Sequence, residues 1–187
     1  MTFKQHLIDI NACEEARIWA GDKTAKECWD TCKRCDWLLW WARKENIEKK
    51  LYVKSACRIA RLVIHLDKSG KGILAIEAAE NWLAEPTENN RIKCFSVYAD
   101  DPYVAYDAGD GDAARNAARN AAAAVYNYFN DAYYSACSTA ANAYGAGAGY
   151  ADIIAIIREI IPQPWTEPEA INLETGDGIV IKSNLGQ

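Results

Sequence analysis

The sequence predicts a mainly α-helical protein, a single compact domain of about six to eight helices. Three observations support this fold class. Apolar residues recur at three and four positions rather than at two. Helix caps and helix breakers separate these repeats. Alanine, which has the highest helix propensity, is concentrated between residues 113 and 151. With 187 residues, half of them hydrophobic, the chain can bury one core.

Short helices are expected in the first fifty residues. An apolar stripe over residues 13–20 stops at Gly21, a residue typical of helix ends. Thr24 is a suitable N-cap for the next helix, with Glu27 as its capping-box partner. Asp36 is expected to cap a third helix, "WLLWWARKENIEKK", whose apolar start gives way to charge. Asp36 could instead orient an arginine that contacts a ligand.

Two longer helices are expected next. Residues 51–66 are strongly amphipathic, with apolar side chains at spacings of three and four. "DKSGKG", residues 67–72, is a turn sequence. The following helix covers residues 73–83 and ends before Pro86, because the residue preceding a proline disfavours helical backbone.

The last part of the domain contains the alanine-rich segment. Residues 91–112 are expected to form a short helix and a loop, and Asp112 then caps a long helix over residues 113–144, interrupted or kinked at some point. "YGAGAGY" is a break, and residues 151–161 form an apolar helix ended by Pro162.

The predicted organisation is therefore one helical domain over residues 1–161, followed by a proline-rich tail over residues 162–187. The tail contains one short β-like run at residues 179–182. It either packs along the body through Trp165 or is loose in part.

The alanine-rich segment suggests both a cavity and close helix contacts. Tyr126 and Tyr133 are expected to share one helical face with Phe129 and Tyr134. Small side chains leave space that such aromatic rings could line. Alanine also lets helices approach closely, within or between chains, so a homo-oligomer is compatible with the sequence.

Three cysteines in "CWDTCKRC", Cys28, Cys32 and Cys35, have the C-x3-C-x2-C spacing that radical enzymes use for an iron–sulfur cluster. The chain lacks the βα alternation and the length of the barrel that accompanies such clusters. A zinc site would need a fourth ligand such as Cys57 or His65, and a redox C-x-x-C would need a βαβ setting. We favour a buried helical stripe, since free cysteines are usually buried, and expect neither a metal nor a cofactor.

The same region resembles a helical immunity-protein-like domain found in phage and bacterial open reading frames. The resemblance covers most of residues 10–160. Its matching positions are Cys13, Ala16, Trp19, Gly21, Trp29, Cys32, Asp36, Trp37, Leu38, Leu39 and Trp40, followed by Cys57 and Arg58. Cys35 stands where the family pattern has glycine. The resemblance implies neutralisation of a toxin or immune effector by binding, without enzymatic activity, and it supplies no site residues.

Candidate ligand-binding residues are aromatic and cationic. Trp37 and Trp40 are i and i+3 on one helix and form either core or a stacking wall for a base. Arginine forks suit phosphate, although each arginine alone is more often solvated. The full set of candidates is Trp37, Trp40, Arg58, Arg61, Arg115, Arg119, Tyr126 and Tyr133.

Composition and missing motifs disfavour several protein classes. A net charge of −5 argues against binding to duplex nucleic acid. No apolar run reaches the roughly 20 residues of a membrane span, and the N-terminus lacks the pattern of a secretory signal. We therefore expect a cytoplasmic protein, in the host cytosol if phage-encoded. His6 and His65 have no identifiable catalytic partners, so no enzyme is expected.

Three functions remain open. The favoured one is a phage counter-defence sponge that sequesters a nucleotide-derived immune signalling molecule, which needs affinity and no chemistry. The alternative is an immunity protein that neutralises a protein toxin by direct binding, with exposed Trp and Tyr as anchors. The third is an enzyme or metal protein built on the cysteines. A deep pocket lined by Trp or Tyr and by Arg, often at a subunit junction, would favour the first function. An exposed acidic or aromatic patch without a pocket would favour the second.

Overall fold

The computed structural model describes residues 2–100, 109–126 and 129–167, and within them the regular structure is entirely helical. The mainly α fold class is confirmed. The helices are α1 (Phe3–Asp9), α2 (Glu14–Ala20), α3 (Ala25–Thr31), α4 (Cys35–Lys44), α5 (Lys49–Arg61), the 3₁₀ helix η1 (Ile64–Leu66), α6 (Lys71–Ala84), α7 (Glu88–Asp100), α8 (Asp110–Tyr126), α9 (Phe129–Gly145) and α10 (Tyr150–Ile160). These described residues form more than the six to eight helices expected, because α1 was not predicted and residues 113–144 contribute to two helices.

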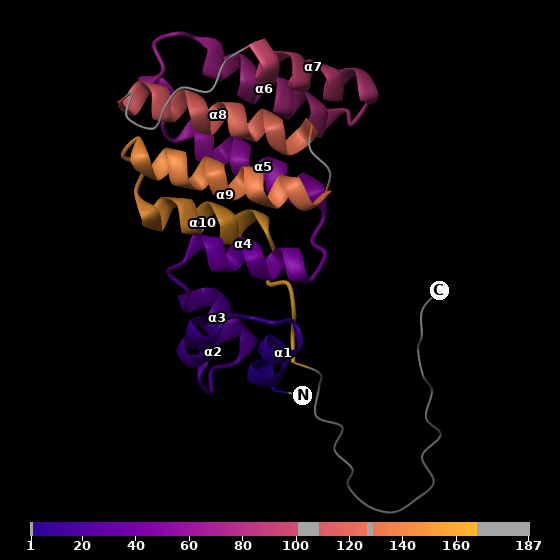
Figure 1. Cartoon of the computed structure of the whole chain (residues 1–187), viewed down its shortest axis with the longest axis vertical. Helices are drawn as coiled ribbons and strands as arrows, with labels where there is room; N and C mark the ends of the chain where they lie inside the picture. Colours follow the sequence, from indigo (N-terminus) through magenta and orange to yellow (C-terminus); the bar gives the residue numbers. More distant parts are fainter. Residues whose placement is uncertain (1, 101–108, 127–128, 168–187) are drawn as a thin grey trace, which may run out of the picture.

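The helices are stacked along the long axis of the molecule (Figure 1). α6 and α7 lie at one end, and the short helices α1, α2 and α3 lie at the other. α8, α9, α10 and α4 follow one another between these ends, with α5 packed on α8 and α9. α4 is therefore the layer that joins the N-terminal helices to the rest of the molecule.

The alanine-rich helix α8 is the centre of the core. It packs against α5, α6, α7 and α9. Ala117, Ala118 and Ala121 are fully buried, which is possible on several faces only because the side chains are small. A Cβ atom added to Gly72 of α6 would lie 3.3 Å from the Cβ of Ala118. The small residues of α8 are thus used for close helix packing.

The predicted interruption of the helix over residues 113–144 is confirmed, and the segment forms two antiparallel helices, α8 and α9, which lie side by side (Figure 1). The hydroxyl of Thr139 on α9 donates to the carbonyl oxygen of Ala117 on α8 at 3.3 Å. Tyr126 consequently belongs to α8 and Tyr133 to α9, so the predicted shared face of these rings does not form. Residues 127–128, between the two helices, lie outside the described residues.

The helix ends confirm some predicted caps and correct others. The capping box is present: the Thr24 hydroxyl accepts from the backbone N–H of Glu27 at 3.2 Å, and the Glu27 carboxylate accepts from the N–H of Thr24 at 2.8 Å. Gly21 ends α2 with φ +55°, a value that favours glycine. Asp112 is not the cap of the next long helix, because α8 already begins at Asp110.

The cysteine triplet and Asp36 also differ from expectation. α3 ends at Thr31, Cys32 is extended, and α4 begins at Cys35 with Arg34 as its N-cap. Cys28, Cys32 and Cys35 are therefore not on one helix, although all three are buried as predicted. Asp36 lies in the first turn of α4 and is not its cap.

The first residues of the tail pack on the body. The ring of Trp165 stacks on His6 with a centroid distance of 4.2 Å and lies 5.7 Å from Phe3, both on α1. Of the two alternatives for the tail, packing through Trp165 holds for these first residues, and residues 168–187 lie outside the described residues. The β-like run at residues 179–182 lies outside the described residues. Within the described ranges, no helix is long and apolar enough to cross a membrane.

Candidate ligand-binding site

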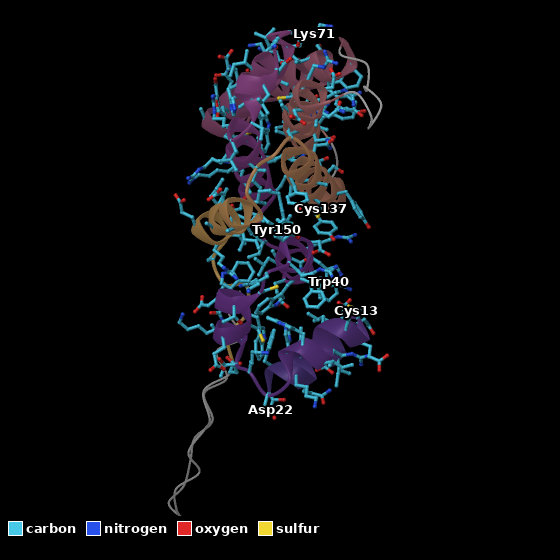
Figure 2. All side chains as sticks on the ribbon, turned by 90° about the vertical axis from the view of Figure 1, so that its left-hand side faces the viewer. Cys13, Asp22, Trp40, Lys71, Cys137 and Tyr150 are labelled. Atoms are coloured by element: carbon cyan, nitrogen blue, oxygen red, sulfur yellow. The ribbon has the colours of Figure 1, made fainter. Side chains whose placement is uncertain are left out.

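A cavity of about 330 Å³ lies where the N-terminal helices meet α4. Six aromatic residues contribute to its walls: Phe3, Trp19, Trp37, Trp40, Trp41 and Tyr133. They come from α1, α2, α4 and α9, so residues far apart in the sequence form one site. Figure 2 shows Trp40 on α4 and Cys13 at the start of α2 on the same side of the molecule, and both line the cavity.

The aromatic walls are accessible from solvent. Trp19, Trp37 and Trp40 are half-buried, so each ring keeps part of its surface available. The rings of Trp19 and Trp37 meet edge to face at 5.8 Å and 63°, a favourable geometry for aromatic pairs. Asn11 and Cys13 are exposed and also line the cavity, which places its mouth beside the start of α2.

Each accessible aromatic ring of the cavity carries a basic side chain. The pairs, with distances from the cation to the ring centroid, are Lys23 with Trp19 (4.6 Å), Arg34 with Trp37 (4.6 Å), Arg43 with Tyr133 (5.1 Å) and Lys44 with Trp40 (5.3 Å). All four distances lie within the roughly 6 Å over which a cation is attracted to a ring face. The four cations are not themselves among the lining residues, but each lies over a ring that is.

Asp36 is the one carboxylate among the lining residues. Arg34 holds it with two hydrogen bonds, from Nε to Oδ1 at 3.0 Å and from Nη2 to Oδ2 at 2.6 Å. Burial would raise the pKa of Asp36, but the hydrogen bonds and charge of Arg34 outweigh burial and hold this pKa below its usual value. The cavity therefore contains an ionised, oriented carboxylate at neutral pH.

The cysteines at this site are buried thiols. Cys28 and Cys32 line the cavity. Burial raises the pKa of Cys28 to about 11 and also raises the pKa of Cys32. Cys35 points elsewhere and lies 3.3 Å from the hydroxyl of Tyr150 on α10. In the part of the chain that the structure describes, no group of three or more His, Cys, Asp or Glu side chains is arranged to hold a metal ion.

Three of the predicted site residues come together in this cavity: Trp37, Trp40 and Tyr133. Tyr126 does not line it, and its ring lies 4.6 Å from Phe95 on α7. The four predicted arginines do not line it either. Arg58 pairs with Glu159, Arg61 with Glu80 (2.7 Å), Arg115 with Asp112 (2.6 Å), and Arg119 lies over the ring of Tyr98 (3.9 Å).

The cations at the cavity were partly readable from the sequence. Trp19 and Lys23, like Trp40 and Lys44, are separated by four residues, a spacing that brings side chains together on a helix or at its end. Arg43 reaches Tyr133 only because α4 packs on α9, and no local spacing indicates this pair. A basic residue four positions after a tryptophan was therefore a usable signal in the sequence. The choice of Arg58 and Arg61 as candidates did not use it.

Comparisons with known proteins return no match: no family model, no curated protein and no solved structure is similar to this chain. The resemblance to the immunity-protein-like domain therefore stays a prediction from its motifs.

Proposed function

We propose that this protein binds a small anionic molecule with a planar aromatic ring, of the nucleotide class, in the cavity between the N-terminal helices and α4. The observation that carries the proposal is the set of four cation–aromatic pairs around the cavity. Aromatic rings provide stacking surfaces for a base. Lys23, Arg43 and Lys44 provide cations for phosphate, whereas the Arg34 fork holds Asp36.

The dimensions of the cavity suit a ligand of this class. Its volume of about 330 Å³ is at the small end of the roughly 300–1,000 Å³ usual for small-molecule sites. A base with its sugar would occupy the aromatic interior, and the phosphates would lie toward the exposed Lys23 and Lys44. Stacking on an aromatic side chain is worth about 1–3 kcal/mol per base.

The proposed role is sequestration. The motif resemblance implies neutralisation by binding, so the protein would act as a phage counter-defence sponge that removes a nucleotide-derived immune signal from the host cytosol. The ligand leaves the site chemically unchanged. Holding a ligand requires preorganised walls, which the packed Trp19–Trp37 pair supplies.

A second candidate function, neutralisation of a protein toxin, has one observation in its favour. Ile92, Phe95 and Tyr126 form an exposed apolar cluster on α7 and α8, with relative exposures of 49%, 42% and 37%. Exposed aromatic side chains of this kind anchor protein interfaces. The cluster is separate from the cavity, so substitutions can test the two functions independently.

Equilibrium dialysis against mononucleotides and cyclic dinucleotides, followed by mass spectrometry of the released ligand, tests the proposed function. We expect a bound nucleotide that is recovered intact, and a Trp37→Ala variant that binds it about tenfold or more weakly because a stacking wall is lost. Trp82→Ala is the matched control, since Trp82 is also half-buried with a lysine on its ring but lies on α6. The proposal would be contradicted if the wild-type protein bound no nucleotide. It would also be contradicted if Trp37→Ala and Trp82→Ala weakened binding equally.

A further inference from the structure

We infer that the cavity prefers guanine over other bases, with the carboxylate of Asp36 as the group that recognises the base edge. This inference rests on the proposed function and names the ligand class of the same site. It starts from the position of Asp36, the one carboxylate among the residues that line an otherwise aromatic and apolar cavity.

The position of Asp36 relative to Trp40 allows stacking and edge recognition by one ligand. The two residues are i and i+4 on α4, so their side chains lie on the same face of the helix, about 5–6 Å apart at Cβ. Both line the cavity. A base stacked on the ring of Trp40 therefore has one edge within reach of the Asp36 carboxylate.

Asp36 retains acceptor capacity although it is paired. A carboxylate offers about four lone-pair positions, and the Arg34 fork occupies one on each oxygen. The backbone N–H groups of Asp36 and Trp37 also hydrogen-bond this carboxylate and help to lower its pKa. The side chain of Asp36 is nevertheless 45% exposed, so a ligand can still reach the carboxylate. Arg34 also fixes the orientation of the carboxylate and keeps it ionised, and hydrogen bonds to an ionised acceptor are stronger than neutral ones.

The hydrogen-bond pattern of guanine matches this acceptor. Guanine presents two adjacent donors on one edge, the ring N1–H and the 2-amino group, and a carboxylate can accept both. Hypoxanthine keeps N1–H but lacks the amino group, so it forms one of the two bonds. Adenine presents a ring nitrogen lone pair beside its amino group, which repels the carboxylate. A site that hydrogen-bonds a particular group discriminates strongly against analogues without it.

Titration calorimetry with three nucleotides that share the same sugar and phosphate, GMP, IMP and AMP, tests the inference. We expect wild-type protein to bind GMP about tenfold or more tightly than AMP, with IMP between them. Asp36→Asn should remove this preference, because an amide supplies one acceptor instead of two. Glu15→Gln is the matched control, since Glu15 also contacts Arg34, at 3.4 Å, but does not line the cavity.

The outcomes separate the inference from the proposed function. If wild-type protein binds all three nucleotides equally and Trp37→Ala weakens each, nucleotide binding stands and the guanine preference is wrong. If Asp36→Asn still prefers GMP over AMP, another residue recognises the base, and the inference is also overturned. If none of the three mononucleotides binds, the guanine inference fails, and the dialysis against cyclic dinucleotides decides the proposed function separately. The comparison of GMP with IMP needs no substitution, so a poorly folded variant does not obscure the result.

Discussion

The residues of α4 divide between the buried core and the wall of the cavity. Leu39 and Ala42 are i and i+3 and fully buried, whereas Trp37 and Trp40, also i and i+3, are half-buried and line the cavity. This division follows from helical periodicity, and Trp37 and Trp40 could therefore be identified from the sequence as one surface. Periodicity does not show what a surface faces, so Trp19 and Tyr133 as its opposing walls were not predictable.

Thiol reactivity tests the residue-level description of the cavity. Cys13 is exposed, whereas Cys28 and Cys32 are buried. Burial raises the pKa of Cys28 to about 11, so at neutral pH it is almost entirely the unreactive thiol. We expect a maleimide reagent at pH 7 to label native protein first at Cys13, with all seven cysteines reacting after unfolding. Mass spectrometry of tryptic peptides locates the label.

Nucleotide should slow the labelling of Cys13, because Cys13 lines the mouth of the cavity. Nucleotide should not change the rate at which the unfolded protein is labelled. This control excludes a direct reaction between the maleimide reagent and the nucleotide. Rapid labelling of Cys28 in the native protein would contradict the described packing of α3.

Helices were predictable where their signals are local, and their ends were missed where distant contacts set them. The Thr24–Glu27 capping box is a local signal and was identified correctly. α3 ends at Thr31 because Arg158 of α10 donates to the carbonyl oxygens of Trp29 and Cys32 at 2.7 and 2.6 Å. Arg158 is more than a hundred residues away in sequence, so "CKRC" gives no indication of the break.

The packing of α8 gives a prediction at the level of elements. Ala118→Leu introduces a larger side chain at a fully buried position close to Gly72, and such overpacking usually costs about 1–3 kcal/mol. We expect the free energy of unfolding, measured by urea denaturation, to fall by that amount. Ala141→Leu is the control, because Ala141 is exposed on the neighbouring helix α9. Equal stability of the two variants would show that α8 is not closely packed.

At the scale of the whole molecule, the core and the cavity occupy different parts of the helical stack. The alanine-rich helix forms the core with α5, α6, α7 and α9, whereas the tryptophan-rich helices form the cavity at the other end. The fold class was predictable from composition and periodicity, but this separation was not, since the sequence suggested one cavity within the alanine-rich region. Because most alanines of α8 are buried within the chain, they are not available for contacts between chains. The predicted homo-oligomer would therefore have to form through other surfaces.

Several carboxylates contribute to stability in a pH-dependent way. Burial would raise the pKa of Asp67, but hydrogen bonds from Ser69 and from the N–H of Gly72 (2.8 Å) outweigh it and lower this pKa from 3.8. A lowered pKa in the folded state gives stability that is present above the unfolded value and is lost as pH falls through the folded value. Asp36 has the same sign, through Arg34.

We therefore expect the free energy of unfolding to be nearly constant between pH 7 and about pH 5 and to decrease at lower pH. Asp67→Asn should reduce stability at pH 7 and make the acid dependence shallower. Urea denaturation at pH 7, 5 and 3.5 measures both effects. An unchanged acid dependence in this variant would rule out Asp67 as a contributor.

The most direct test of the cavity as the ligand site is the ¹H–¹⁵N spectrum of the seven tryptophan indoles during titration with GMP. We expect the signals of Trp19, Trp37 and Trp40, which line the cavity, to shift with one common dissociation constant. The signals of Trp82 and Trp165, which do not line it, should stay in place. Shifts confined to Trp82 or Trp165, or no shift at millimolar GMP, would contradict nucleotide binding at this site.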